Sequence, residues 1–227
     1  TYVTSEYEDT KLPSSGILLK QEIGGSVFEV AFIPVGKTNI NPTFTEYLFP
    51  AGSESRESRA DNSKWATRLV GSLAKLDYAI SYVDGTDPQS DTALLNDSDE
   101  IMEYDPSASL VQIITDMNEY NRAKRVYNRL KSVGMDLQLG LASWIPKLSV
   151  VQYFTKDEDG TNPFIKNEWY QYLLGGEIKF GSATLNLYAG SQVIENYQEE
   201  TPLDLKTNFL NGQRREHTNI ISGYFDV

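Results

Sequence analysis

Strict alternation of apolar and polar side chains is the feature that most constrains this chain. From Val133 to Leu141 every odd position is apolar, while the even positions hold two glycines, Asp136 and Gln138. A period of two residues predicts a β-strand with one apolar face, because successive side chains of a strand point to opposite sides. Nine residues is also about the length that a tilted strand needs to cross a membrane.

The same alternation recurs along the chain and predicts an all-β protein. It is clear in residues 76–83, 170–180 and 184–193, and weaker in residues 28–32 and 64–69. Three further segments alternate imperfectly but are plausible strands: 17–23, 147–155 and 218–225. These segments together predict about nine strands in one domain that covers residues 1–227.

The connections between these strands alternate between short and long. Short links fall at 24–25, 72–74, 143–146 and 181–182, and long polar segments occupy 36–62, 85–121, 157–166 and 199–213. Successive links of an antiparallel meander lie at opposite ends, so all the short links should share one end. Outer-membrane barrels have short periplasmic turns and long extracellular loops. We therefore expect an antiparallel up-and-down transmembrane β-barrel.

One of the long segments also shows helical spacing. Leu110, Ile113, Ile114 and Met117 predict a short helix over 107–121, inside the long segment 85–121.

Composition excludes several other classes of protein. The chain has no cysteine, so it has neither a disulfide framework nor a thiolate metal site. It lacks the run of about 20 apolar residues that a membrane-spanning helix needs. Thirty-two acidic against 20 basic residues give a net charge of −12, which repels nucleic-acid phosphates. We expect no nucleic-acid partner.

Several segments resemble a known family. They are Phe28 to Pro34 with its Ile-Pro step, Trp65 to Leu69 with Arg68 leading into Leu76 to Tyr82, Arg129 to Leu139 with the Val-Gly-x-Asp pattern of Val133 to Asp136, and Asn167 to Gln192. They resemble a group of Gram-negative outer-membrane porin-like β-barrels classed as a domain of unknown function, over most of residues 17–197. The resemblance implies a pore-forming or solute-uptake barrel in the outer membrane, with small or apolar organic solutes as cargo.

The predicted number of strands indicates whether they make up a complete barrel. Bacterial single-chain barrels have an even number of strands, whereas about nine are expected here. We therefore expect this chain to form part of a larger barrel.

Charged residues of the strands are expected to line the lumen. They fall opposite the apolar positions, where they avoid the cost of facing lipid. Mixed signs fit a polar pore that selects among solutes, although the same charges could simply pair and rigidify the wall. The predicted lumen residues are Lys20, Glu22, Glu29, Lys64, Arg68, Asp77, Asp136, Glu177 and Lys179.

Aromatic residues near the expected strand ends predict the girdles that such barrels place at both membrane surfaces. Ordinary packing within a sheet is the alternative explanation. The predicted girdle residues are Trp65, Tyr82, Tyr127, Trp144, Trp169, Tyr170 and Tyr172.

Acidic loop residues offer only a weak metal signal. Asp97 and Asp99 form one acidic run, and Asp157 and Asp159 form another that partly matches a calcium loop. Glycine stands at the wrong position of that loop, so solvated acidic loops are the better interpretation. We expect no bound metal and no cofactor.

Nothing in the sequence predicts an enzyme. His217 is the single histidine, and no Gly-x-Ser-x-Gly motif accompanies it. The expected partners are outer-membrane lipid, lipopolysaccharide and small solutes, with self-association or a partner protein in the lumen left open. The alternatives to a pore are a soluble or surface-attached all-β ligand-binding or adhesion module, and a barrel that forms a sleeve around a partner protein.

Overall fold

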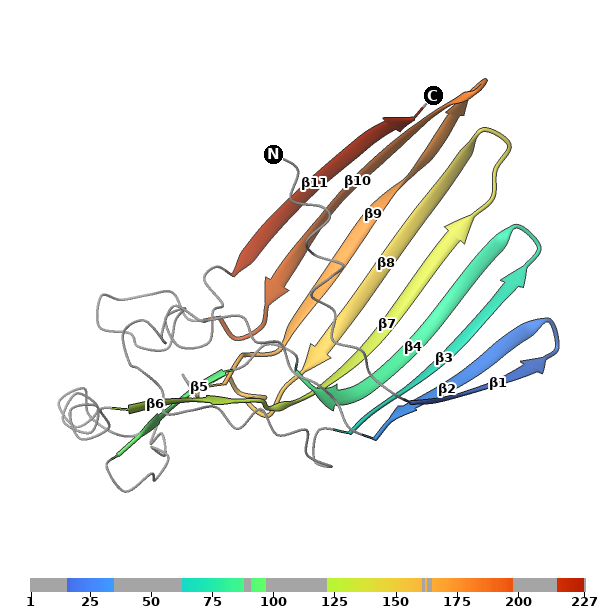
Figure 1. Cartoon of the computed structure of the whole chain (residues 1–227). Coiled ribbons are helices and arrows are strands. Elements are labelled where there is room, and N and C mark those ends of the chain that lie inside the picture. Colours follow the sequence, from blue (N-terminus) through green and yellow to red (C-terminus); the bar gives the residue numbers. More distant parts are fainter. Residues whose placement is uncertain are drawn as a thin grey trace.

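A single antiparallel sheet dominates the structure, a computed structural model that describes residues 16–34, 63–87, 91–96, 122–160, 162, 165–197 and 216–226. The sheet has nine strands in the order β1-β2-β3-β4-β7-β8-β9-β10-β11 (Figure 1). Its strands are β1 (Ile17–Ile23), β2 (Ser26–Ile33), β3 (Lys64–Leu73), β4 (Leu76–Thr86), β7 (Arg129–Leu139), β8 (Trp144–Phe154), β9 (Trp169–Phe180), β10 (Ala183–Ile194) and β11 (His217–Asp226).

The up-and-down arrangement confirms the strand pattern expected from the sequence. All nine expected segments are strands, and each pairs with its neighbour in an antiparallel register. The described residues contain no helix, and the helix expected at 107–121 lies outside them. Within the described part of the chain, no helix has the length and hydropathy to cross a membrane.

A second, two-stranded sheet was not expected from the sequence. Strand β5 (Asp91–Leu95) pairs with β6 (Arg122–Val126) between β4 and β7. Strand β4 also continues to Thr86, and β7 starts at Arg129, four residues before the alternation becomes strict at Val133. The segment expected to begin as a loop at residue 85 therefore contains strand structure.

Four short turns lie together at one end of the sheet (Figure 1). They join β1 to β2, β3 to β4, β7 to β8, and β9 to β10. Gly24 and Gly25 both have positive φ, as the two central residues of a tight hairpin turn require. Ala74 occupies the same left-handed region at φ 56°, where a residue with a side chain is disfavoured.

These turns also step along the strand direction. The row of paired residues that contains Ile23, the last residue of β1, crosses β9 at Leu174. Strand β9 continues beyond that row to Phe180 before it turns. The turn end of the sheet is thus slanted relative to the hydrogen-bonding direction.

The register sorts the side chains of the nine strands into two different faces. One face, here called the apolar face, carries rows such as Phe28–Leu69–Ile80–Met135. Among the described strands its charged residues lie only near the long-loop end: Asp84, Arg129, Lys131 and His217. The opposite face, here called the charged face, carries the charged residues of the strand interiors.

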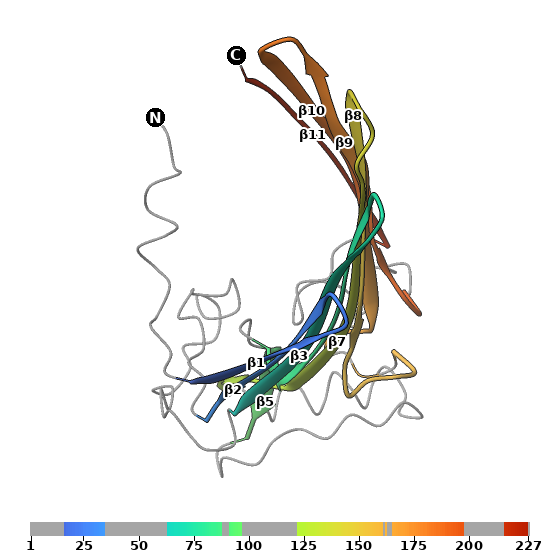
Figure 2. The ribbon, with the colours of Figure 1, turned by 90° about the vertical axis from the view of Figure 1, so that its right-hand side faces the viewer.

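The apolar face is uncovered, and the sheet has almost no buried apolar core. Leu174, Leu187 and Ile221 expose 59%, 51% and 87% of their surface. Among the described residues, the buried apolar side chains are Ala79 and Ile194. The sheet curves strongly (Figure 2), and its two edges, β1 and β11, do not pair with each other. The nine strands of the main sheet therefore form an open, curved wall of one layer.

Candidate functional site

All nine charged residues that the sequence predicts to line a lumen lie on the charged face. Lys20, Glu29 and Arg68 are neighbours in one cross-strand row. The Lys20 Nζ and Glu29 Oε1 atoms form an ion pair of 2.6 Å. Alternation assigned these residues to one face of each separate strand. The register between strands places them all on the same side of the sheet.

A second set of ion pairs lies nearer the turns. The Glu177 carboxylate is 3.2 Å from Lys179 Nζ on its own strand and 4.0 Å from Lys147 Nζ on β8. Glu177 is thus shared by two cations, and the wall is locally cross-linked.

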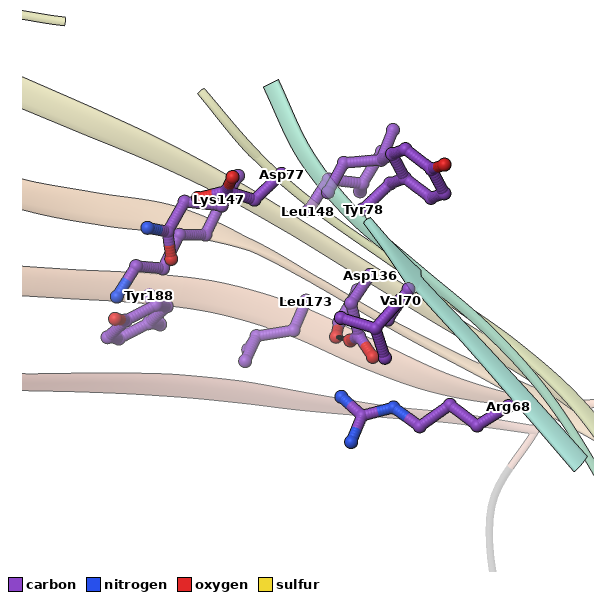
Figure 3. A pocket seen from close by; sticks show the side chains of 13 residues that line it. Arg68, Val70, Asp77, Tyr78, Asp136, Lys147, Leu148, Leu173 and Tyr188 are labelled. Atoms are coloured by element: carbon purple, nitrogen blue, oxygen red, sulfur yellow. Dashed lines mark hydrogen bonds between the residues drawn. The ribbon is translucent and has the colours of Figure 1, made fainter. Parts of the chain in front are cut away.

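A hollow of about 480 Å³ lies on the charged face, inside the curve of the sheet. Figure 3 shows Arg68, Asp136, Leu173 and Tyr188 projecting to the same side, whereas Tyr78 points away. Strands β3, β4, β7, β8, β9 and β10 all contribute to the hollow. Its lining is Arg68, Val70, Asp77, Tyr78, Ala79, Asp136, Leu137, Gln138, Lys147, Leu148, Ser149, Leu173 and Tyr188.

The two carboxylates of the hollow are held by hydroxyl groups. Ser149 donates a hydrogen bond to Asp136, and Ser72 donates one to Asp77. Each hydroxyl group fixes the orientation of the carboxylate that accepts its hydrogen bond. Both carboxylates therefore remain available as acceptors without a cation paired to them among the described residues.

Arg68 differs from Lys20, Lys147 and Lys179, the cations of the charged face that form ion pairs. Its guanidinium group makes no ion pair or hydrogen bond within the described residues, and the neighbouring Glu29 is already bound to Lys20. A guanidinium group carries five N–H donors in a planar fork. Arg68 thus offers unused donors to whatever occupies the hollow.

A buried polar network lies at the opposite, long-loop end of the wall. Lys166 Nζ lies 2.7 Å from Asp87 Oδ2, and both side chains are about nine-tenths buried. Lys64 and Tyr153, which lie on the charged face, interact electrostatically with Asp87. This ion pair ties the connection between β8 and β9 to the end of β4.

Two further contacts extend this network. Arg129 Nε donates to Asp84 Oδ1 at 2.6 Å, which joins β7 to β4. The Asn167 amide donates to the backbone oxygens of Glu195 and Asn196, both at 3.1 Å. Connections that are distant in sequence are thereby held together by polar side chains and not by an apolar core.

Glu168 lies among like charges beside this network. Partial burial, the nearby Glu195 and more weakly Glu158 raise the pKa of its carboxyl group, while a hydrogen bond from the Thr155 backbone opposes the shift. The raised pKa means that ionised Glu168 is disfavoured in the folded structure.

Two of the weak calcium candidates, Asp157 and Asp159, lie among the described residues. The Asp157 carboxylate accepts a hydrogen bond from the Asn162 backbone at 3.0 Å, and Asp159 is exposed. Asp97 and Asp99 lie outside the described residues. In the described part of the chain, no group of three or more His, Asp or Glu side chains could hold a metal ion. Asp157 therefore stabilises its own loop.

Most of the predicted girdle aromatics share the apolar face. Trp65 and Tyr82 pack with ring centroids 5.1 Å apart, and Tyr170 and Tyr172 stack at 6.5 Å. Trp144 lies on the same face at the turn end.

Two predicted girdle residues lie elsewhere. Trp169 directly precedes Tyr170, so it points to the charged face, where it stacks on Tyr153 at 4.6 Å. Tyr127 lies between β6 and β7, outside a strand.

His217 lies at the edge of the sheet. Its Nε2 atom is 3.5 Å from Glu216 Oε1, and within the described residues no hydroxyl group hydrogen-bonds to it.

Of the residues that line the hollow, the sequence predicted only Arg68, Asp77 and Asp136. Lys147 and Tyr188 lie on β8 and β10, and alternation could have placed each on the charged face of its own strand. Their approach to Arg68 and Asp136 depends on the register between strands. Compared with known proteins, the chain matches no family model and no curated protein.

Proposed function

We propose that this chain forms the wall of an outer-membrane β-barrel that passes small solutes through a polar lumen of mixed charge. The observation that carries the proposal is the contrast between the two faces of one uncovered sheet. The apolar face is exposed along its length, while the charged face lies on the inside of the curve. Lipid against the apolar face and water against the charged face would give each face a medium of matching polarity.

The exposed apolar residues support lipid as the covering medium. Soluble monomers rarely expose contiguous apolar patches larger than a few hundred Å². Here the exposed apolar side chains continue from Leu19 on β1 to Ile221 on β11, across every strand of the sheet. Aromatic residues lie near both ends of this face, as the girdles of membrane barrels do.

An open sheet is incompatible with the bilayer interior, because unpaired backbone groups cannot be hydrated there. We propose that the edges β1 and β11 are paired in the membrane by further strands. The resemblance of the sequence to Gram-negative porin-like barrels is consistent with this arrangement.

Leu173 and Leu174 provide a matched test of the membrane interface. They are adjacent on β9, yet Leu174 lies on the apolar face and Leu173 lies on the charged face. Arginine on the lipid face at mid-membrane costs about 2–4 kcal/mol, whereas a lumen-facing arginine avoids this cost. Leu174→Arg should therefore reduce the folded, heat-modifiable protein in outer-membrane fractions, and Leu173→Arg should not.

Conductance tests the pore itself. The complete protein, reconstituted in planar bilayers, should open channels whose cation-to-anion selectivity changes when Asp136 or Glu177 is replaced by lysine. A protein that stays in solution without detergent, or equal losses for both leucine variants, would refute the membrane wall.

A further inference from the structure

The hollow on the charged face presents balanced charges to its contents. Arg68 and Lys147 contribute two positive charges, and Asp77 and Asp136 contribute two negative charges. A simple cation or anion bound there would meet repulsion from its like charges. A molecule that carries both signs would meet attraction at each end.

The Arg68 guanidinium group and the Asp136 carboxylate belong to different strands of the wall. Arg68 is on β3 and Asp136 is on β7, two strands across and two residues along, which places their Cα atoms about 12 Å apart. Both side chains project into the hollow (Figure 3), and no ion pair joins them within the described residues. Both charged groups border the same hollow, where one small molecule can contact them together.

Apolar side chains flank Asp136 in its own cross-strand row. Val70 and Ala79 precede it, and Leu173 follows two strands later. All three line the hollow. A ligand held by its charged groups would thus rest its hydrocarbon part on these side chains, and a volume of about 480 Å³ is ample for it.

We propose that the hollow binds small zwitterionic solutes with an aliphatic side chain, the chemistry of an apolar α-amino acid. The Arg68 guanidinium group takes the carboxylate through paired N–H donors, and the Asp136 carboxylate takes the ammonium group. This inference rests on the proposed function, because it names the class of solute that passes along the charged face. Weak binding suits this role, since a transported solute must also leave.

Leucine and two fragments of it test the proposal. 4-Methylpentanoate keeps the carbon skeleton and carboxylate of leucine but lacks the ammonium group, and 3-methylbutylamine keeps the ammonium group but lacks the carboxylate. Ligand-observed NMR titrations on the complete protein in detergent should show leucine binding at least about fivefold more tightly than either fragment, because each lacks one charge-assisted contact. Glucose, which is neutral, should bind no better than the fragments.

Charge-removing variants assign the contacts. Arg68→Gln should weaken leucine binding about fivefold and leave 3-methylbutylamine binding unchanged. Asp136→Asn should weaken leucine binding similarly and leave 4-methylpentanoate binding unchanged. Lys75→Gln in a turn and Asp159→Asn in a loop are matched controls away from the hollow, and both should bind leucine as the unaltered protein does.

Other results would overturn the proposal. If 4-methylpentanoate or glucose binds as tightly as leucine, the hollow is an anion or sugar site. If the control variants lose as much affinity as Arg68→Gln, general charge and not the hollow governs binding. Because these titrations need no open channel, leucine binding without conductance would refute only the proposed pore, and conductance without selective leucine binding would refute only this site.

Discussion

Replacing Lys166 with methionine should destabilise the fold by about 3–5 kcal/mol, because the change removes the ammonium group that contacts the buried Asp87 carboxylate. The Nζ–Oδ2 distance is 2.7 Å, and the side chains are only 9% and 10% exposed. At an effective dielectric constant of about 20, two unit charges at this distance attract by about 6 kcal/mol. Desolvation of both groups opposes this attraction, so we expect a coupling energy of about 3 kcal/mol.

A double-mutant cycle isolates that coupling from the other contacts of each residue. Lys166→Met, Asp87→Leu and the double variant are unfolded with guanidinium chloride in detergent micelles and followed by tryptophan fluorescence. The double variant should recover a large part of the stability that each single variant loses, because it removes both charges of the pair.

The exposed pair between Lys20 and Glu29 is the matched control. Its charged atoms are 2.6 Å apart, but the Lys20 side chain is 57% exposed. Solvent screening should make the coupling in this pair much smaller than that of the buried pair. A coupling as large in the exposed pair as in the buried one would show that burial does not set the strength of these contacts.

Three further changes test the loop and turn ends. Ala74→Gly should stabilise the protein by about 0.5–1 kcal/mol in the same unfolding assay, because glycine accepts the positive φ without strain; a loss of stability would contradict that reading of the turn. In the folded protein the pKa of Glu168 is raised above its ordinary value of 4.5. Protonated Glu168 therefore contributes fully to folding stability below pH 4.5, and this contribution is lost as the pH rises through the folded pKa. Glu168→Gln should therefore be more stable than the unaltered protein at pH 8 and equally stable at pH 4, and a constant difference across that range would exclude titration of this group. Tyr153→Leu should cost about 1 kcal/mol by removing the stack on Trp169, and an unchanged unfolding midpoint would show that the stack contributes nothing.

The strands were predictable because a sheet with one apolar face requires apolar residues at every second position of each strand. Val133, Met135 and Leu137 share one face and Asp136 the other, so alternation alone assigns both the strand and its faces. The start of β7 at Arg129 was not predictable in this way. That end is held by a charge pair with Asp84, which leaves no apolar periodicity to detect.

The hollow was less accessible to sequence reasoning than the faces. Arg68 and Asp136 were placed on the charged face correctly, but their convergence with Lys147 depends on the register of four strands. Register arises from turn lengths and from contacts across the sheet. The Lys166–Asp87 pair lies still further from sequence reasoning, because its partners are 79 residues apart and come from irregular segments.

The stepped turns have a geometrical consequence for any wall built from this sheet. Between β1 and β9 the turn end advances from the level of Leu174 to Phe180, about 20 Å of strand, while crossing six inter-strand spacings, about 29 Å. If the turns lie at one membrane surface, the strands are inclined by about 35° to the membrane normal, close to the inclination of closed membrane barrels.

That inclination means that a row of paired residues is not a level of constant depth. Ile23 and Leu174 belong to one row, yet Ile23 would lie at the membrane surface and Leu174 near the bilayer centre. Arginine should be tolerated at residue 23 far better than at residue 174, although the same line of paired residues contains both.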